Sequence, residues 1–364
     1  MGDLVSPAVF DFWIQKLDPS WSWQRPLARV TARRVESLDT VTLVLRPNRH
    51  WRALGGFQPG QHVNVTAEVD GVRVTRSYSL SDAPRRDGQL AITVRQVEAG
   101  RLSGHLCRTV RVGDVLGLGP AFGAMTWPDQ ARGRWAFLAA GSGITPVMSL
   151  LRAFAAGRDS RRSPSFDGVD SVTLVYWARH RAELCFVPEL EQLALRDPRL
   201  KLHVVLTREA GEATGSIQPG RRLDAALLRD LGLPGDVPCQ VFACGPAGFV
   251  ETARQLLAGQ VPSFHAEAFT PAAAAPVSSG TVPVHLATSG RTLELPVGMP
   301  LLAALEAQGL HPPSGCRMGI CHTCVCPKLA GTTQDLGTGT SSDEPDPALR
   351  LCVSTARSPL TLDL

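Results

Sequence analysis

Four cysteines near the end of the chain have the spacing of a metal-binding loop. Cys316, Cys321 and Cys324 are separated by four and then two residues, and Cys352 follows later. Thiolates are the ligands that iron–sulfur clusters and zinc prefer. The chain has nine cysteines and no signal peptide, so an extracellular disulfide framework is a poor explanation for them. We therefore predict that these four thiols hold a metal centre.

The spacing C-x4-C-x2-C with a distant fourth Cys resembles plant-type [2Fe–2S] ferredoxins, in which four thiolates hold two irons. By this resemblance the end of the chain is a β-grasp ferredoxin domain. Small residues at Gly315 and Gly319 leave backbone N–H groups free to point at the sulfurs. Zinc is the alternative, although only Cys321 and Cys324 form a short knuckle. Cys326 is expected to be a buried small hydrophobe, and His322 replaces a glycine that is common in the family.

A second group of motifs lies in the first third of the chain. Arg76-Ser-Tyr78-Ser79 is followed by Arg95 and by Gly100-Arg-Leu-Ser103-Gly-His-Leu106. A guanidinium and a helix N-terminus suit a pyrophosphate, and we expect Ser103 to cap a helix over 104–110.

This order of motifs resembles the ferredoxin-NADP reductase superfamily, whose FAD-binding motif is R-x-Y-S followed by G-x-x-S-x-x-L. The resemblance implies that Arg76 pairs with the FAD pyrophosphate, Tyr78 packs on the isoalloxazine and Ser79 hydrogen-bonds near flavin N5. Taken singly, Tyr78 would be interpreted as a core aromatic and Arg76 as a solvated residue at a strand end.

A third group of motifs follows apolar runs further along the chain. Gly141-Ser-Gly143-Ile-Thr145-Pro146 comes after one run, and Cys244-Gly245-Pro246 after another. A glycine turn between a strand and a helix presents N–H groups to a pyrophosphate, and Pro146 suits position N1 of that helix. The superfamily resemblance places Cys244 beside the nicotinamide and Phe269 over the flavin. An inert buried cysteine and ordinary aromatic packing are the alternatives.

The choice between NADPH and NADH depends on basic residues. Thr207-Arg208 is similar to the Ser-Arg pair that binds the 2′-phosphate in NADP-preferring members, and Arg179 and Arg221-Arg222 are candidates to assist. The alternative is that each is a solvated arginine in an arginine-rich chain. The sequence favours NADPH over NADH.

The elements that must position these motifs fall into distinct stretches. Six short apolar runs with turn residues between them predict an antiparallel barrel over 27–130, and strand–helix alternation predicts a parallel sheet with helices over 131–270. Residues 271–280 are expected to be a linker, 281–364 the ferredoxin domain, and 1–26 an aromatic segment that packs on the body. The chain is therefore multidomain.

Composition excludes several classes of function. The chain has 364 residues, 44% of them hydrophobic, and a net charge of +4, which is too small a surplus to indicate nucleic-acid binding. No apolar run is long enough to span a membrane, so the expected compartment is the cytoplasm.

Taken together, the motifs predict an electron-transfer oxidoreductase. The order of domains implies a path from NADPH through FAD and [2Fe–2S] to an external acceptor. Families with this arrangement serve oxygenases. The N-terminal Asp-Phe-Trp and Trp-Ser-Trp strings and the His322 variant look most like reductases of membrane desaturases. Ring-hydroxylating dioxygenases and alkane hydroxylases are the alternative acceptors, and a flavin and iron–sulfur redox sensor is the alternative of another class.

Overall fold

The computed structural model describes residues 6–157, 164–209, 216–235, 237–269 and 280–364. The chain divides into two compact units, Met1–Phe269 and Thr270–Leu364. The linker expected at 271–280 lies outside the described residues except for Gly280. Among the described helices, none combines the length and the apolar character needed to cross a membrane.

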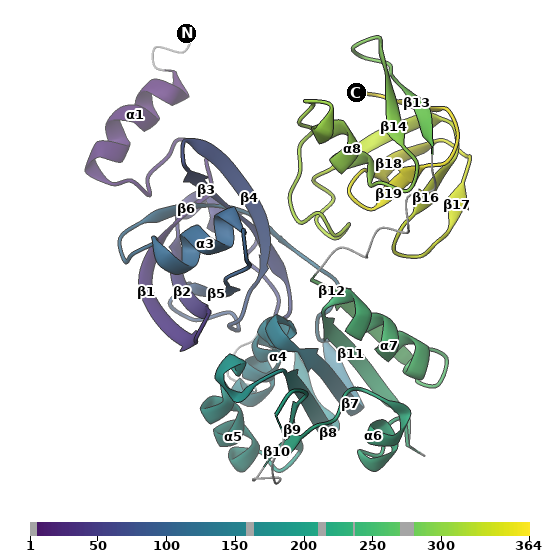
Figure 1. Ribbon diagram of the computed structural model, residues 1–364. Helices are drawn as coiled ribbons and strands as arrows, with labels where there is room; N and C mark the ends of the chain where they lie inside the picture. Colours follow the sequence, from purple (N-terminus) through teal and green to yellow (C-terminus); the bar gives the residue numbers. More distant parts are fainter. Residues whose placement is uncertain (1–5, 158–163, 210–215, 236, 270–279) are drawn as a thin grey trace. The chain divides into compact units, whose positions relative to one another are not determined.

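The first unit begins with a barrel of six antiparallel strands (Figure 1). They are β1 (Leu27–Ser37), β2 (Thr40–Pro47), β3 (His62–Val69), β4 (Val72–Ser79), β5 (Leu90–Arg95) and β6 (Val115–Phe122), in the spatial order β4-β3-β6-β1-β2-β5. A bridge between Leu80 and Ile92 joins the two ends of this order. The interior is filled by inward-facing Val and Leu side chains of all six strands. The predicted barrel of six antiparallel strands is confirmed.

Three helices accompany the barrel. They are α1 (Pro7–Leu17), α2 (Arg49–Ala53) and α3 (Arg101–Arg108). The Asn48 side chain caps α2 by accepting the N–H of Trp51, whose indole N–H donates to the Gly119 carbonyl. Leu102 and Leu106 of α3 are buried in the barrel core, so this helix covers one end of the barrel.

The second part of this unit is a six-stranded parallel sheet with helices on both faces (Figure 1). Its strands are β7 (Gln130–Ala140), β8 (Ser165–Ala178), β9 (Leu200–Leu206), β10 (Ile217–Pro219), β11 (Cys239–Gly245) and β12 (Ser263–Ala268), in the order β10-β9-β8-β7-β11-β12. Its helices are α4 (Ile144–Ala156), α5 (Val187–Arg196), α6 (Ala225–Asp230) and α7 (Ala247–Leu257).

Alternate residues of β7 explain this layering. Trp135 and Phe137 pack with α4 and α5, whereas Ala136 and Leu138 face α6 and α7. The predicted alternation of strand and helix is confirmed. The expected position of Pro146 is wrong by two residues, because α4 begins at Ile144 and Pro146 stands at the third helical position. No helical hydrogen bond is lost there, since the first-turn N–H groups have no partner within the helix.

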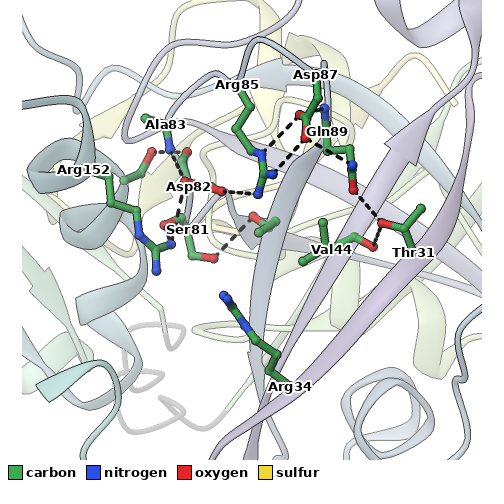
Figure 2. Close-up of polar contacts among 12 residues, drawn as sticks. Thr31, Arg34, Val44, Ser81, Asp82, Ala83, Arg85, Asp87, Gln89 and Arg152 are labelled. Carbon is green, nitrogen blue, oxygen red and sulfur yellow. Dashed lines mark hydrogen bonds and ion pairs between the residues drawn. The ribbon is translucent and has the colours of Figure 1, made fainter. Parts of the chain in front are cut away.

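Polar contacts from α4 attach the sheet to the barrel. The Arg152 guanidinium donates to the Ser81 carbonyl at 2.6 Å and pairs with Glu189 of α5 at 2.6 Å. Figure 2 shows Arg152 reaching the segment with Ser81 and Asp82, while Asp82 also faces Arg85. The Ser149 hydroxyl donates to the Asp82 carbonyl at 2.7 Å and accepts the Gly60 N–H at 3.2 Å. These buried and partly buried hydrogen bonds therefore join the barrel to the parallel sheet.

The second unit has a five-stranded sheet, a three-stranded sheet and one helix. Its elements are β13 (Thr281–Leu286), β14 (Arg291–Pro296), α8 (Leu301–Ala307), β15 (Val325–Ala330), β16 (Thr333–Asp335), β17 (Ser341–Ser342), β18 (Asp346–Arg350), β19 (Ser354–Ala356) and β20 (Leu360–Leu362). Leu301 and Leu305 of α8 are buried against the larger sheet. The sequence predicts a hairpin over 282–297, a helix over 300–310 and a last strand near 360–364, and all three are present. The short strands β15 to β19 were not predicted.

Candidate functional site

The folded second unit brings the four predicted metal ligands together. Three cysteines lie in the loop between α8 and β15, and the fourth lies in the turn between β18 and β19. Thiol–thiol contacts join them in one row, in the order Cys321, Cys316, Cys352, Cys324. Cys326 is buried as expected and its thiol contacts the Pro327 and Asp363 carbonyls instead. In the described part of the chain, no group of three or more His, Cys, Asp or Glu side chains is arranged to hold a single metal ion.

Backbone donors surround the sulfurs in the way that an anionic cluster requires. The donor–sulfur pairs are Cys316 N–H to Cys321 Sγ (3.2 Å), Met318 N–H to Cys316 Sγ (3.3 Å), Gly319 N–H to Cys352 Sγ (3.2 Å) and Thr323 Oγ1 to Cys321 Sγ (3.1 Å). Hydrogen bonds to sulfur stabilise the negative charge of an iron–sulfur centre and tune its potential. The loop therefore fits a [2Fe–2S] cluster in its donors as well as in its ligands.

The thiols also polarise one another. Hydrogen bonds from the Cys321 and Cys352 thiols lower the pKa of Cys316 to about 2, and the hydrogen bond from Cys352 lowers the pKa of Cys324 to about 7. The thiolate is the form in which cysteine binds a metal. The same contacts raise the pKa of Cys321 and Cys352, so the four thiols do not lose their protons independently of one another.

The shape of the cysteine loop depends on left-handed residues. Gly319 has φ +76°, and an added Cβ would lie 3.0 Å from Val353 Cγ2. His322 has φ +52°, the region that favours glycine, which explains why glycine is common at this position in the family. The Arg317 guanidinium pairs with Glu306 of α8 at 2.6 and 2.8 Å. This pair fastens the loop to the helix before it.

In the first unit, the predicted flavin motif lies where β3 and β4 pair. Ser79 is opposite His62 in the register and Tyr78 is opposite Val63. The Ser79 hydroxyl is buried and makes no hydrogen bond among the described residues. A buried hydroxyl without a partner is costly, so this atom fits a bound group that hydrogen-bonds there. Burial raises the pKa of Tyr78, so its phenol stays neutral.

The helix predicted after this motif differs from expectation at its start. Gly100, not Ser103, is the N-cap of α3, which begins at Arg101. The Ser103 hydroxyl lies in the first turn, accepts the Val97 N–H at 3.1 Å and donates to the Gly100 carbonyl at 3.3 Å. Its role is to tie α3 to the preceding turn. A cavity of about 340 Å³ borders Gly100 and Arg101.

A buried pair next to Ser79 was missed by sequence reasoning. His62 Nε2 lies 3.1 Å from Glu267 Oε2, yet neither atom makes a hydrogen bond among the described residues. The His62 ring stacks on Phe122 and meets Phe269 edge-on, with ring centroids 5.8 and 5.9 Å apart. The only sequence signal was a histidine in an otherwise apolar strand. The pairing itself joins β3 to β12, which lie about 200 residues apart in the sequence.

The two glycine turns predicted for the nucleotide meet one another closely. A Cβ on Gly143 would lie 2.0 Å from the Cys244 carbonyl oxygen, so only glycine permits this approach. The Thr145 hydroxyl donates to the Ser142 carbonyl at 2.9 Å and holds the first turn. Pro246 is the N-cap of α7 directly after Gly245. Backbone N–H groups at two helix starts thus converge at the carboxyl ends of β7 and β11, where such sheets bind ligands.

Cys244 lies fully buried at the centre of this arrangement. Burial and the nearby Glu267 carboxylate raise its pKa, so the side chain is a neutral thiol. Glu267 is opposite Cys244 in the parallel register of β11 and β12, and the Phe269 N–H donates to the Gly245 carbonyl. The structure therefore gathers Cys244, Ser79 and Phe269 around the His62–Glu267 pair, and all three were predicted as site residues.

Arg95 and Arg208 occupy different settings. Arg95 pairs with Asp39 at 2.7 Å and with Glu183 at 3.3 Å, and a Cβ on Gly141 would lie 3.5 Å from its Nη1. Arg208 is exposed at the end of β9, where its N–H donates to the Arg179 carbonyl at 3.0 Å.

Two features define the class of protein. One is the set of four thiols with N–H donors beside them, and the other is the pair of glycine turns that meet at a buried thiol. Together they indicate an oxidoreductase with flavin, pyridine-nucleotide and [2Fe–2S] modules. Family models agree with this assignment. The oxidoreductase FAD-binding domain matches residues 27–127, the oxidoreductase NAD-binding domain 137–255, and the 2Fe-2S iron-sulfur cluster binding domain 284–357.

Whole-chain relatives extend the match. The chain is 33% identical to an NADPH oxidoreductase of Mycobacterium tuberculosis, over 99% of this chain and 90% of that protein. It is 31% identical to a glycine betaine monooxygenase reductase subunit of Chromohalobacter salexigens, over 84% of this chain and 87% of that one. Phthalate dioxygenase reductase shares the fold with a TM-score of 0.60 at 23% identity, over 93% of this chain and 97% of that one. This chain belongs to the ferredoxin-NADP reductase superfamily, in the group that carries a [2Fe–2S] ferredoxin domain.

Proposed function

We propose that the chain is the reductase component of an oxygenase system and draws its electrons from NADPH. When bound, FAD would supply the exchange of a hydride for single electrons, and a [2Fe–2S] cluster held by the four thiols of the second unit would supply one-electron transfer. One observation carries the proposal. The same chain contains two glycine turns in close contact, at Gly143 and Cys244, and a loop of four thiols that accept backbone N–H groups. The relative of Chromohalobacter salexigens, a monooxygenase reductase subunit, supports this assignment.

Residues of the first unit are proposed to bind and orient the flavin. The Ser79 hydroxyl supplies a hydrogen bond near flavin N5, the Tyr78 ring covers the isoalloxazine, and Arg76 pairs with the pyrophosphate. Gly100 supports this, because it opens the N-terminus of α3. Ser103 acts indirectly by holding that turn. Arg95 acts indirectly as well, through its pairs with Asp39 and Glu183 beside Gly141.

The nicotinamide nucleotide is proposed to lie across Gly141, Gly143 and Thr145 and to reach the Cys244-Gly245-Pro246 turn. The buried Cys244 thiol excludes water and orients the nicotinamide, and Phe269 shields the flavin face. His62 and Glu267 position these two residues, since the His62 ring meets Phe269 edge-on and Glu267 is opposite Cys244 in the register of β11 and β12.

NADPH is preferred over NADH in this proposal because Arg208 is exposed at the end of β9, beside Arg179 at the end of β8. The Arg208 guanidinium suits the 2′-phosphate, whereas that of Arg179 pairs with Glu183 at 2.6 Å. The NADPH oxidoreductase of Mycobacterium tuberculosis supports the same choice.

The test is an anaerobic titration of the purified holoprotein with NADPH and, separately, with NADH, following flavin and cluster absorbance together. The proposal expects both chromophores to bleach, with a lower NADPH than NADH concentration at half-reduction. Flavin bleaching with an unresponsive cluster would refute the electron path. A redox sensor, the alternative of another class, would bleach once but would not sustain turnover with an artificial acceptor.

The electron acceptor is proposed to be an oxygenase-type partner reached from the cytoplasm. A membrane desaturase is the preferred partner because of the N-terminal aromatic strings, and soluble dioxygenases and alkane hydroxylases are the alternatives. Reconstitution with each class decides the matter. NADPH-dependent product from a desaturase would support the preference, whereas product from a soluble dioxygenase alone would overturn it.

A further inference from the structure

The helix α1 is fastened to the body of the first unit by its charged side. Asp11 accepts the Trp23 N–H at 2.6 Å and the Ser22 hydroxyl at 2.8 Å, and it pairs with Arg25 at 3.1 Å. The Phe10 ring meets the Trp23 ring edge-on, with centroids 4.8 Å apart. The face of α1 that carries Asp11 is therefore the inner face.

The opposite face of α1 is apolar and exposed. Phe12, Trp13 and Leu17 are 59%, 62% and 80% exposed, and Val9 is exposed beside them. At 100° per residue, Val9 and Trp13 lie nearly opposite Asp11 on the helix. The expectation that these aromatics pack on the body is therefore wrong for Phe12 and Trp13. A soluble helix normally turns its apolar stripe inward, and an outward stripe of this kind marks an interaction surface.

Cationic side chains lie beside the exposed face of α1 and in the cavity behind it. The Lys16 ammonium lies 4.6 Å from the Phe12 ring centroid and 4.8 Å from the Trp13 ring centroid. A cavity of about 560 Å³ lies between the inner face of α1 and α2. Its cationic lining is Arg29, Arg46, Arg49 and Arg52, with His50 beside them. The one carboxylate in the lining, Asp18, already pairs with Arg29 at 2.5 Å.

We propose that α1 and the adjoining arginines form a docking surface for an anionic phospholipid membrane. In this proposal Phe12, Trp13 and Leu17 enter the interface between headgroups and acyl chains, and the Lys16 ammonium beside them meets headgroup phosphates. Arg49 and Arg52, in the cavity on the other side of α1, add positive charge that attracts an anionic surface. Short helices with aromatic and basic residues lie in this interface, and Trp is enriched there. The outward side chains of α1 offer no hydrogen-bond acceptor to fix the register of a protein partner, whereas a fluid interface requires none.

The proposal is independent of the proposed electron path, because lipid binding is measured without turnover. The full-length holoprotein is floated with vesicles of phosphatidylcholine alone and of phosphatidylcholine with phosphatidylglycerol. Binding is expected to the anionic vesicles, and to weaken as salt is raised. The double variant Phe12→Ser/Trp13→Ser is expected to bind at least about tenfold more weakly, and Arg49→Gln/Arg52→Gln to lose the preference for anionic lipid.

A control replaces two leucines elsewhere that are even more exposed than Phe12 and Trp13. Leu38→Ser/Leu195→Ser changes residues that are 89% and 86% exposed and should bind vesicles like the wild type. Leu17→Gln serves as a second variant should Phe12→Ser/Trp13→Ser alter folding. NADPH-driven flavin bleaching should be unchanged in all α1 variants.

Two outcomes would overturn the proposal. One is that the wild type does not float with anionic vesicles. The other is that the α1 variants and the leucine control bind equally. If the α1 variants instead slow electron delivery to an oxygenase in the absence of lipid, the surface docks a protein and the membrane assignment is wrong.

Discussion

The contact between the two glycine turns gives a direct test of the nucleotide site. Gly143 has φ −60° and ψ −13°, which alanine adopts without strain, so Gly143→Ala changes only the space that the side chain occupies. The new Cβ would lie 2.0 Å from the Cys244 carbonyl oxygen and 2.8 Å from the Gly245 nitrogen. Both neighbours are backbone atoms, which cannot rotate away as a flexible side chain would.

The magnitude follows from the geometry. Ordinary contact begins at 3.4 Å, so the turns must separate by roughly 1.4 Å. Overpacking of this kind costs about 1–3 kcal/mol of stability. A displacement near 1 Å at a reacting centre reduces the rate by on the order of 100-fold. We therefore expect a lower unfolding temperature and a much slower reduction of the flavin by NADPH.

Gly248→Ala is the matched control. Gly248 lies in α7, and no atom lies within 4 Å of the Cβ that alanine would add. This variant should be neutral or slightly stabilising, since alanine favours helix. Scanning calorimetry and stopped-flow flavin bleaching would be measured for both variants. If Gly143→Ala matched Gly248→Ala in both assays, the close approach of the turns would not govern the site.

Three further predictions address the other parts of the site. Cys352→Ser should abolish the cluster, seen as loss of iron and acid-labile sulfide. Cys326→Ser should keep the cluster, because that thiol contacts carbonyls and not the four predicted ligands. Equal metal content in the two variants would contradict the ligand assignment. Arg208→Ala should raise the KM for NADPH by roughly 10–150-fold and leave that for NADH unchanged, as expected for a charged hydrogen bond worth about 1.5–3 kcal/mol; a parallel rise for both nucleotides would remove Arg208 from the 2′-phosphate. Burial raises the pKa of Asp39, but hydrogen bonds and charge from Arg95 outweigh it and hold the pKa below the ordinary 3.8. That pair therefore contributes stability above the ordinary pKa and loses it as pH falls through the lower folded value, so the unfolding temperature of Arg95→Gln should fall less steeply than that of the wild type between about pH 5 and 3. Identical slopes would show that the pair does not contribute to stability.

Much of the fold followed from periodicity and turn residues. The barrel strands were predicted because apolar alternation was interrupted at Pro59-Gly60, Asp70-Gly71 and Asp87-Gly88. The strands β15 to β19 were missed because they are short and lack alternation, and their pairing is fixed by partners distant in sequence. Helix starts were misplaced by two or three residues at α3 and α4, because capping depends on backbone geometry that composition does not reveal.

The sequence by itself predicted four cluster ligands, the two glycine turns and the order of the modules, because these features depend on residue type and local spacing. Only the tertiary structure revealed the His62–Glu267 pair, the meeting of Gly143 with Cys244 and the outward apolar face of α1. Each of these joins segments that are far apart in the chain, or depends on which side of a helix faces the body. Such relations are set when the chain packs, since local patterns carry no information about the partner across the interface.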